Sequence, residues 1–372
     1  MEGRKIMSKI VSIPLAIIMT IISFIFPCKQ NNVDSSQWKT NYPYVFVHGL
    51  MGWGSYDAQY KIMPYWGMFG GELLGKLNDK GYDCYAASVS GTKSAWDRAC
   101  ELYAQLTGTQ VDYGEEHSNR CGHERFGTDY TGKALIEKWD EDNKINLLGH
   151  SFGGATMRVF ASLMAKGSEK EMNTTSADEI SPLFTGGKED WIYSLTALAA
   201  PHNGTSSYNI GGESPAPETE AEKDSAAYDM YIDNALELNK TIYTSKESYY
   251  FSIPCTATEK NEDGTYSAIK NKMEFIFVDS SNAIGAFIGK TRGGFEIDES
   301  WQENDGLVNT ISAMAPSSAP SKSFDENRIE KGTWQIMPTY QGDHMSLQGG
   351  LFKVNTDVER LYTEHLDMIN AL

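Results

Sequence analysis

The chain has 372 residues, of which 32 are Lys or Arg and 50 are Asp or Glu, so its formal net charge is −18. With 40% hydrophobic and 22% charged residues, the composition excludes an intrinsically disordered protein. The acidic balance also argues against a nucleic-acid-binding protein, because contact with phosphates requires a basic surface. The length allows one large domain or two ordinary ones.

The N-terminus has the layout of an export signal. Arg4, Lys5 and Lys9 precede an uninterrupted apolar run over residues 10–26. A basic segment followed by an apolar one is typical of a signal peptide. The run is also nearly long enough to span a bilayer. We therefore expect residues 1–27 to be a signal peptide or a membrane anchor, and the protein to be secreted or held through residues 10–26.

Strand-like and helix-like patterns alternate along the rest of the chain. The expected strands are residues 44–47, 84–89, 145–148, 191–200, 249–253 and 275–278. The expected helices are residues 72–80, 135–139, 153–166 and 358–369. This alternation predicts an α/β fold with a mostly parallel central sheet. The segments 211–225 and 315–327 are loop-like and are interpreted as insertions on one domain. Cys84, Cys100, Cys121 and Cys255 are too scattered for a disulfide scaffold, so we expect free buried thiols.

The strongest local motif is Gly149-His150-Ser151-Phe152-Gly153, which has the form G-x-S-x-G. Alone it is a weak signal in a chain with 34 glycines, where an ordinary serine in a Gly-rich turn is the alternative. Here, however, the motif follows a predicted strand and opens a predicted helix, as a nucleophile elbow requires. The context therefore predicts Ser151 as a nucleophile.

A serine nucleophile needs a base and an acid that orients the base. In an α/β-hydrolase these follow in the order Ser, Asp or Glu, His. His344 fits best, because His202 comes too early and His365 lies in the predicted closing helix. Asp305 is the candidate acid, although Asp-Gly is also a common turn sequence.

An oxyanion hole needs two backbone N–H groups. One should come from Phe152, the residue after the nucleophile, and the other from a loop after an early strand. The loop over residues 48–52 (HGLMG) makes the Leu50 N–H the candidate, with a plain Gly-rich turn as the alternative.

These residues resemble a known family, the zinc-containing lipases and esterases of Gram-positive bacteria, of the thermophilic bacillus and staphylococcal type. The resemblance rests on SAWDRACE at residues 94–101, on WQENDG at residues 301–306 and on Asp343-His344. It runs from about Tyr42 to the C-terminus, except around residues 205–224 and 315–330. It implies an α/β-hydrolase catalytic domain over residues 42–372, with helices on both faces of the sheet. It also supports Asp305 as the acid.

The resemblance implies a zinc-stabilised insertion, in which two Asp and two His hold a structural zinc ion. At the matching positions these ligands are Asp97, His117, His123 and Asp224. Four protein ligands would close such a site. Without the family, His117 and His123 would be interpreted as exposed loop residues.

Two departures from the family shape the functional expectation. Residues 205–223 are short, polar and acidic where the true lipases have a two-helix lid, so we expect a short-lid, esterase-like member. The positions that would bind calcium hold Ser346 and Leu351, neither of which is acidic, so no calcium site is expected.

The sequence therefore predicts a secreted serine carboxylic-ester hydrolase, a lipase or esterase that works through an acyl-enzyme. One alternative is a polyester-cleaving or broad carboxylesterase with little triacylglycerol lipase activity. The other is a non-catalytic surface protein that keeps the fold. The expected partners are an ester or lipid substrate and, peripherally, a lipid or polymer surface, with no nucleic acid. The sequence does not indicate an oligomeric state.

Overall fold

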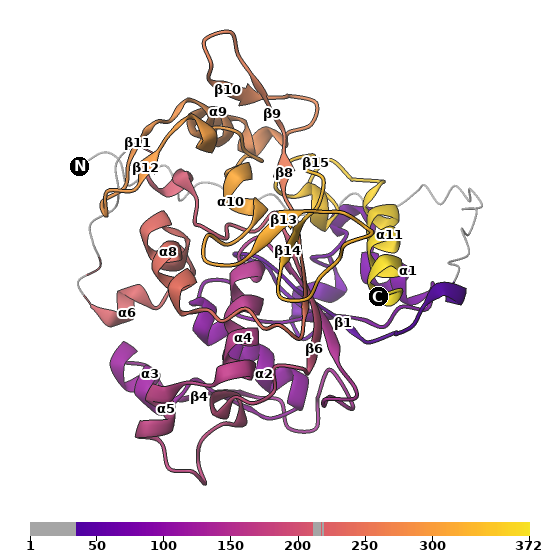
Figure 1. Ribbon diagram of the computed structural model, residues 1–372, viewed down its shortest axis with the longest axis vertical. Helices are drawn as coiled ribbons and strands as arrows, with labels where there is room; N and C mark the ends of the chain where they lie inside the picture. The colour runs from indigo at the N-terminus through magenta and orange to yellow at the C-terminus, as the bar shows by residue number, and fades with distance from the viewer. Residues whose placement is uncertain (1–34, 211–216, 218) are drawn as a thin grey trace. The chain divides into compact units, whose positions relative to one another are not determined.

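Seven strands form one sheet in the computed structural model, which describes residues 35–210, 217 and 219–372 (Figure 1). Their spatial order is β13-β14-β7-β6-β5-β1-β2, and every neighbouring pair is parallel. The strands are β1 Tyr44–Val47, β2 Cys84–Ala87, β5 Ile145–His150, β6 Ile192–Leu198, β7 Tyr249–Ile253, β13 Ser321–Ser323 and β14 Trp334–Ile336. This topology confirms the predicted α/β-hydrolase fold class.

Helices cover both faces of the sheet, so the central strands β1, β5 and β6 are buried at every position. Successive side chains of β1 alternate between the two faces. Val45 and Val47 join a core cluster with α2 and α4, whereas the Phe46 ring contacts Tyr362 on α11 at 5.6 Å. The covering helices are α1 Leu73–Asn78, α2 Ala95–Thr107, α4 Gly153–Lys166 and α11 Val358–Asn370.

Further helices and four two-stranded pairs lie outside this seven-stranded sheet and its covering helices in the described part of the chain. The further helices are α3 Glu115–Cys121, α5 Glu169–Thr174, α6 Glu220–Lys223, α7 Ala226–Met230, α8 Ile232–Thr241, α9 Val278–Ala286 and α10 Thr310–Met314. Four two-stranded pairs are β3 Gln110–Asp112 with β4 Phe126–Asp129, β8 Cys255–Thr256 with β15 Tyr340–Gln341, β9 Thr258–Lys260 with β10 Tyr266–Ala268, and β11 Gly289–Lys290 with β12 Glu296–Ile297.

Four element predictions were wrong. The predicted loop at 211–225 contains the short helix α6. Residues 275–278 form a 3-10 turn that runs into α9, and Phe275 and Ile276 are exposed rather than buried in a strand. Residues 135–139 have no regular structure, and the Leu135 N–H donates to Gln105 O at 2.8 Å. The predicted loop at 315–327 contains β13, an edge strand of the main sheet.

The described cysteines, Cys84, Cys100, Cys121 and Cys255, are free and buried, as predicted. None of the helices in the described part of the chain combines the length and apolar character that crossing a membrane requires. The predicted signal or anchor at residues 1–27 lies outside the described residues.

Candidate functional site

Ser151 sits in a sharp turn between β5 and α4 with a φ of 54°, a conformation that non-glycine residues rarely adopt. The neighbouring glycines make this turn sterically feasible. A Cβ at Gly149 would lie 2.5 Å from the Gly153 backbone, and one at Gly153 would lie 2.2 Å from Val47 O. The motif therefore folds as the strand–turn–helix that lifts a serine hydroxyl out of the sheet.

The structure brings Ser151, His344 and Asp305 together in one hydrogen-bonded chain. The distance from Ser151 Oγ to His344 Nε2 is 2.8 Å, and that from His344 Nδ1 to Asp305 Oδ2 is also 2.8 Å. The other carboxylate oxygen, Asp305 Oδ1, accepts the N–H groups of Leu307 at 3.0 Å and Val308 at 2.7 Å. Asp305 is thus fixed so that it accepts the Nδ1 proton of His344, which leaves Nε2 to accept from the serine.

His344 is buried, which lowers its pKa by disfavouring the imidazolium, but the charge of Asp305 and the hydrogen bond to it outweigh burial. The pKa of His344 is therefore raised above its usual 6.5. Such an environment makes the imidazole a stronger base and stabilises its charged form once a proton has been taken.

Of the two predicted oxyanion donors, Phe152 follows Ser151 directly, and Leu50 belongs to a loop that passes beside Ser151. The Gly49–Leu50 turn passes so close that a Cβ at Gly49 would lie 2.7 Å from Ser151 Cβ. Among the described residues, neither the Leu50 N–H nor the Phe152 N–H donates a hydrogen bond. Two unpaired donors beside a nucleophile are what an oxyanion hole offers to a developing negative charge.

Two residues missed by the sequence analysis connect the parts of this site. The Gly49 N–H donates to Tyr65 Oη at 3.2 Å, and Tyr65 Oη lies 2.6 Å from His150 Nδ1. His150 Nε2 lies 2.7 Å from His344 O, a group that can only accept, so Nε2 carries the proton. Burial lowers the pKa of His150 to about 3, so this ring is neutral. His150 belongs to the G-x-S-x-G motif at residues 149–153, which could have drawn attention to it. No local sequence pattern indicated a role for Tyr65.

Arg98 was also missed as a functional residue, although it lies in the SAWDRACE string. Its guanidinium is fully buried, donates to His48 O and lies 5.0 Å from the centre of the Phe152 ring. It therefore holds the carbonyl that begins the oxyanion loop and packs on the residue that follows the nucleophile.

A cavity of about 290 Å³ opens over Ser151 and His344. Most of its lining is apolar, as an acyl chain would require. The apolar lining residues are Leu50, Met51, Trp53, Met68, Met230, Leu307, Val308, Met345 and Leu351. Thr205, Ser207 and Tyr208 come from the segment expected to be a reduced lid. Residues 211–216 and 218 of that segment lie outside the described residues.

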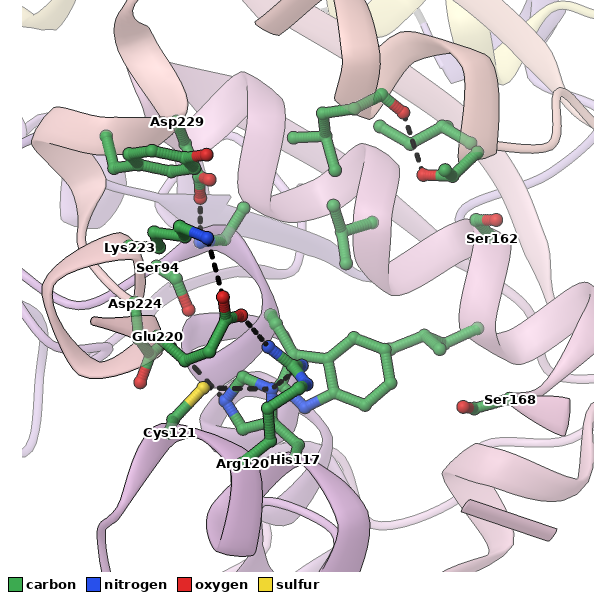
Figure 2. Close-up of a pocket in the computed structure, with 18 of the residues that line it drawn as sticks. Ser94, His117, Arg120, Cys121, Ser162, Ser168, Glu220, Lys223, Asp224 and Asp229 are labelled. Carbon is green, nitrogen blue, oxygen red and sulfur yellow. Dashed lines mark hydrogen bonds and ion pairs between the residues drawn. The ribbon is translucent and has the colours of Figure 1, made fainter. Parts of the chain in front are cut away.

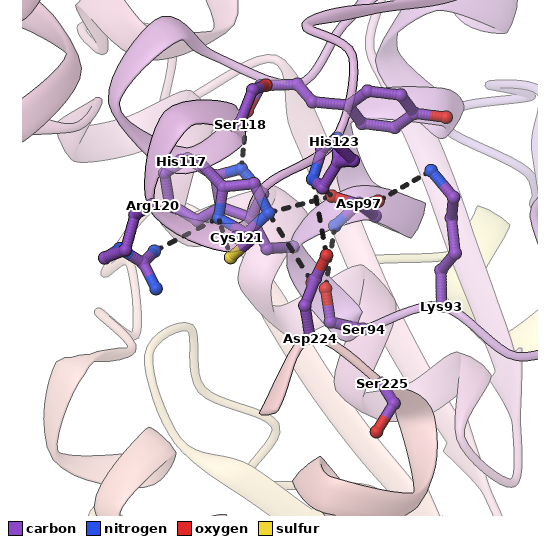
Figure 3. Close-up of polar contacts among 12 residues, drawn as sticks. Lys93, Ser94, Asp97, His117, Ser118, Arg120, Cys121, His123, Asp224 and Ser225 are labelled. Carbon is purple, nitrogen blue, oxygen red and sulfur yellow. Dashed lines mark hydrogen bonds and ion pairs between the residues drawn. The ribbon is translucent and has the colours of Figure 1, made fainter. Parts of the chain in front are cut away.

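The four predicted metal ligands meet at one point (Figure 3). Asp97 lies on α2, His117 on α3, His123 just after α3, and Asp224 just after α6. Their ligand atoms all lie within 4.8 Å of one another. His117 is thus buried on a helix, which corrects the exposed-loop interpretation drawn from the residues alone.

The geometry of this cluster fits a bound cation. The contacts are His117 Nε2–Asp97 Oδ1 at 3.0 Å, His117 Nε2–Asp224 Oδ1 at 3.5 Å, His123 Nε2–Asp97 Oδ1 at 3.8 Å and His123 Nε2–Asp224 Oδ2 at 3.3 Å. Tetrahedral zinc with bonds of about 2.0–2.1 Å separates its ligand atoms by about 3.3 Å.

Two of the inward-facing atoms are unsatisfied. Buried His123 Nε2 and Asp224 Oδ1 form no aligned hydrogen bond with the described residues. His123 Nδ1 lies 2.8 Å from Glu124 O, to which it donates, so the Nε2 lone pair faces the cluster. These four residues could therefore hold a metal ion.

A larger cavity, of about 540 Å³, lies beside this cluster (Figure 2). Its apolar lining includes Trp96, Val159 and Leu163, and its polar lining includes Glu220, which bridges Arg120 and Lys223 at 3.1 and 2.6 Å. Among the described residues, His117 is the one histidine that lines it, and His117 also belongs to the candidate metal-ligand cluster. Size alone would favour this cavity, but Ser151 and His344 line the smaller one.

The chain is similar in sequence to known lipases. A family model described as "Lipase-like, C-terminal domain" matches residues 40–218 and 214–371. Lipase 2 of Staphylococcus aureus is 31% identical over 363 residues, which cover 87% of this chain and 52% of that protein. The lipase of Staphylococcus hyicus is 32% identical, with 84% of this chain and 54% of that protein covered. The chain thus spans about half the length of these curated relatives.

The chain is also similar in structure to solved proteins, one of them a lipase. EstA from Clostridium botulinum has a TM-score of 0.80 and 32% identity, and the match covers 90% of this chain and 88% of that one. The Staphylococcus hyicus lipase has a TM-score of 0.78 and 29% identity, covering 90% and 97% of the two chains.

Proposed function

This chain belongs to the family of lipase-like C-terminal domains, and from that premise we propose that it is a carboxylic ester hydrolase whose acyl-enzyme forms on Ser151. The observation that carries the proposal is the hydrogen-bonded chain from Ser151 Oγ through His344 to Asp305. A serine hydroxyl on a strained turn, a base with a raised pKa and a fixed carboxylate together favour acyl transfer.

In the proposed reaction, Ser151 Oγ attacks the ester carbonyl while His344 Nε2 takes its proton. Asp305 holds the imidazole and stabilises the imidazolium that forms. The N–H groups of Leu50 and Phe152 bind the oxyanion, each donor contributing about 3–4 kcal/mol to the transition state. His344 then protonates the leaving alcohol, and water releases the acid from Ser151 by the same steps in reverse.

The proposed substrates are esters with an apolar acyl part, because the lining of the cavity over Ser151 is mostly apolar. The short polar segment at residues 205–223 favours a broad carboxylesterase that acts on dissolved esters without an oily lid. We expect hydrolysis of tributyrin below its solubility limit. Negligible activity until an emulsion forms would contradict this specificity.

We further propose that Asp97, His117, His123 and Asp224 hold a structural zinc ion. Bound zinc would cross-link α2, α3 and the chain before α7, and four protein ligands leave no position for a reacting water. We propose no calcium site at Ser346 and Leu351. The loop after His344 is held instead by the buried carboxylate of Glu274, whose Oε1 accepts N–H groups of residues 351–353 at 3.2, 2.7 and 2.6 Å.

The catalytic domain is proposed to span residues 42–372, with residues 1–27 directing export or anchoring. N-terminal sequencing of protein recovered from the growth medium would check this. A start near residue 28 is expected for cleavage, whereas an intact residue 1 on a membrane-bound protein would indicate an anchor.

The test of the proposed reaction is Ser151→Ala assayed on p-nitrophenyl butyrate. We expect kcat to fall by about 10⁴-fold or more, with the melting temperature unchanged. Ser194→Ala is a matched control, because Ser194 is a buried serine that donates to Asn146 Oδ1, outside the reaction. Equal hydrolysis by wild type and Ser151→Ala would show that the catalytic assignment is wrong. A wild-type protein inactive on all esters would favour the non-catalytic alternative.

A further inference from the structure

A second set of hydrogen bonds joins the proposed base to the oxyanion loop, residues 48–52. The Gly49 N–H donates to Tyr65 Oη at 3.2 Å, and Tyr65 Oη lies 2.6 Å from His150 Nδ1. His150 Nε2 lies 2.7 Å from His344 O. Tyr65, His150 and His344 are buried. We call these contacts the Tyr65–His150 network.

Each group in the Tyr65–His150 network has only one role. His344 O can only accept, so His150 Nε2 donates to it. Burial lowers the pKa of His150 to about 3, so the ring is neutral and its Nδ1 accepts. Tyr65 must then donate to Nδ1 and accept from Gly49, and burial, which raises the pKa of Tyr65, keeps its hydroxyl protonated. A buried network with every bond made holds its members in fixed positions.

The peptide group between His48 and Gly49 is held at both of its polar atoms. Its carbonyl, His48 O, accepts from the buried guanidinium of Arg98. Its N–H, that of Gly49, donates to Tyr65. This peptide group therefore cannot turn without breaking contacts to two different segments of the protein.

The next peptide group carries the Leu50 N–H, the proposed oxyanion donor. Its carbonyl, Gly49 O, accepts the Gly52 N–H at 3.2 Å and lies 2.9 Å from His48 Nδ1. In a trans peptide the C=O and the N–H point in opposite directions. The contacts of the oxyanion loop thus set the direction in which the Leu50 N–H points.

The Tyr65–His150 network also holds the base. The His344 N–H donates to Asp305 O at 2.8 Å, and His344 O accepts from His150, so both backbone polar groups of the base are fixed. His150 is the last residue of β5 and directly precedes Ser151. A movement of Tyr65 would therefore reach the oxyanion loop directly and the base through His150.

We propose that Tyr65 and His150 are positioning residues that hold the oxyanion loop and the base in register with Ser151, an inference that rests on the proposed ester hydrolysis. Stabilisation of an oxyanion requires donors that are in place before the charge develops. A misplacement of about 1 Å can lower a rate by about 10²-fold. Loss of these contacts should therefore lower kcat and leave binding of the ester nearly unchanged.

The test is Tyr65→Phe assayed on p-nitrophenyl butyrate. This substitution keeps the ring, whose centre lies 5.7 Å from that of Trp53 and 5.3 Å from that of Trp66, and removes only the hydroxyl. We expect kcat to fall about 10- to 100-fold, with KM within about twofold of wild type. The affinity for a boronic acid inhibitor, which binds the nucleophile as a tetrahedral adduct, should fall in parallel.

Tyr250→Phe is the matched control. The buried Tyr250 hydroxyl also accepts a backbone N–H, that of Ser245 at 2.9 Å, but Tyr250 does not line the cavity over Ser151. Both variants leave a backbone donor unpaired, so thermal melts should show similar losses of stability. The kcat of Tyr250→Phe should equal that of wild type.

Two substitutions of His150 separate its hydrogen bonds from its bulk. His150→Gln keeps an acceptor and a donor on one planar group, whereas His150→Leu keeps neither. We expect the kcat of His150→Gln to exceed that of His150→Leu at least tenfold. In Tyr65→Phe/His150→Leu, the loss of kcat should be much smaller than the product of the two single losses, because both residues act through one network.

Any of three results would overturn the inference: equal kcat in Tyr65→Phe and Tyr250→Phe, a raised KM with unchanged kcat in Tyr65→Phe, or equal kcat in folded His150→Gln and His150→Leu proteins. Losses that multiply in the double variant would show that Tyr65 and His150 act separately, and this too would overturn it. Failure of the proposed reaction looks different, because Ser151→Ala would then hydrolyse p-nitrophenyl butyrate as fast as wild type. When Ser151→Ala is inactive, these variants test the positioning role alone.

Discussion

The triad and the metal-ligand cluster both assemble side chains from distant segments, but they are built in opposite ways. From Ser151 to His344 to Asp305, each donor meets one acceptor, so the hydrogen-bonded chain is complete within the protein. In the cluster, carboxylates and imidazoles converge on one point, and His123 Nε2 and Asp224 Oδ1 remain unsatisfied. The proposed triad therefore needs no group from outside the protein, whereas the cluster leaves two inward-facing atoms that a cation could satisfy.

This contrast implies that the two regions control different properties. Damage to the triad should lower kcat and spare stability, and damage to the cluster should do the reverse. Helix α2 joins them, because Asp97 belongs to the cluster while Arg98, the next residue, holds the oxyanion loop through His48 O. Variants in each region should therefore separate the two effects, and the largest change is expected in kcat from the triad.

Asp305→Asn should lower kcat by about 10⁴-fold, because an amide favours the wrong tautomer of His344 and cannot stabilise its charged form. The melting temperature should stay close to that of wild type. Steady-state kinetics on p-nitrophenyl butyrate with parallel thermal melts would check this. A decrease in kcat of less than tenfold would indicate that a residue other than Asp305 orients His344.

His117→Ala should lower the free energy of unfolding by about 3–5 kcal/mol, since it leaves buried carboxylates without their partners. Metal analysis should show zinc lost from the variant and about one equivalent in wild type. Below its lowered melting temperature, kcat should remain within a few-fold of wild type. Unchanged metal content and melting temperature would remove the zinc proposal, as would a chelator-treated wild type that melts unchanged.

Arg98→Met should lower kcat by about 10- to 100-fold with little change in KM, because an unheld oxyanion loop weakens binding of the transition state alone. The affinity for a boronic acid inhibitor should fall in parallel. Arg158→Met is the matched control, because Arg158 is equally buried but donates to Asn239 Oδ1 at 2.7 Å. Equal kcat in the two variants would show that Arg98 is only a packing residue.

The smallest expected effect is a shift in the pH dependence of kcat/KM. His344 must be neutral to act as a base, so a raised pKa moves the acidic limb of kcat/KM above pH 6.5. The same shift means that His344 stabilises the fold at pH values below its unfolded pKa, and that this contribution is lost as pH rises through the folded pKa. An acidic limb well below pH 6.5 would contradict the charge coupling to Asp305.

The turn at Ser151 could be predicted from the sequence more directly than the rest of the triad or the metal-ligand cluster. The elbow at Ser151 is local, because neighbouring glycines and flanking apolar runs specify it within a few residues. Asp305 and His344 are joined to it by tertiary folding, so chain order pointed to them but spacing could not. The candidate metal ligands Asp97 and Asp224 lie far apart in the chain, and family resemblance alone suggested them.

Buried polar residues were the hardest to predict. Tyr65 and Arg98 act through contacts with distant loops, and a single polar residue leaves no periodic pattern. The apolar run at residues 275–278 was assigned to a strand because short apolar runs do not distinguish strand from helix. Phe275 and Ile276 of this run lie instead on the surface, where the Phe275 ring contacts that of Phe352.

The central claim, that Ser151 is the nucleophile, is tested most directly by covalent labelling. Wild-type protein is inactivated with diethyl p-nitrophenyl phosphate. The mass of the intact protein is then measured, and the modified residue is identified by peptide mass spectrometry. We expect a single phosphoryl adduct per chain on the peptide that contains Ser151, growing in proportion to lost activity, and no adduct on Ser151→Ala. Complete inactivation with the adduct on another residue would contradict the account.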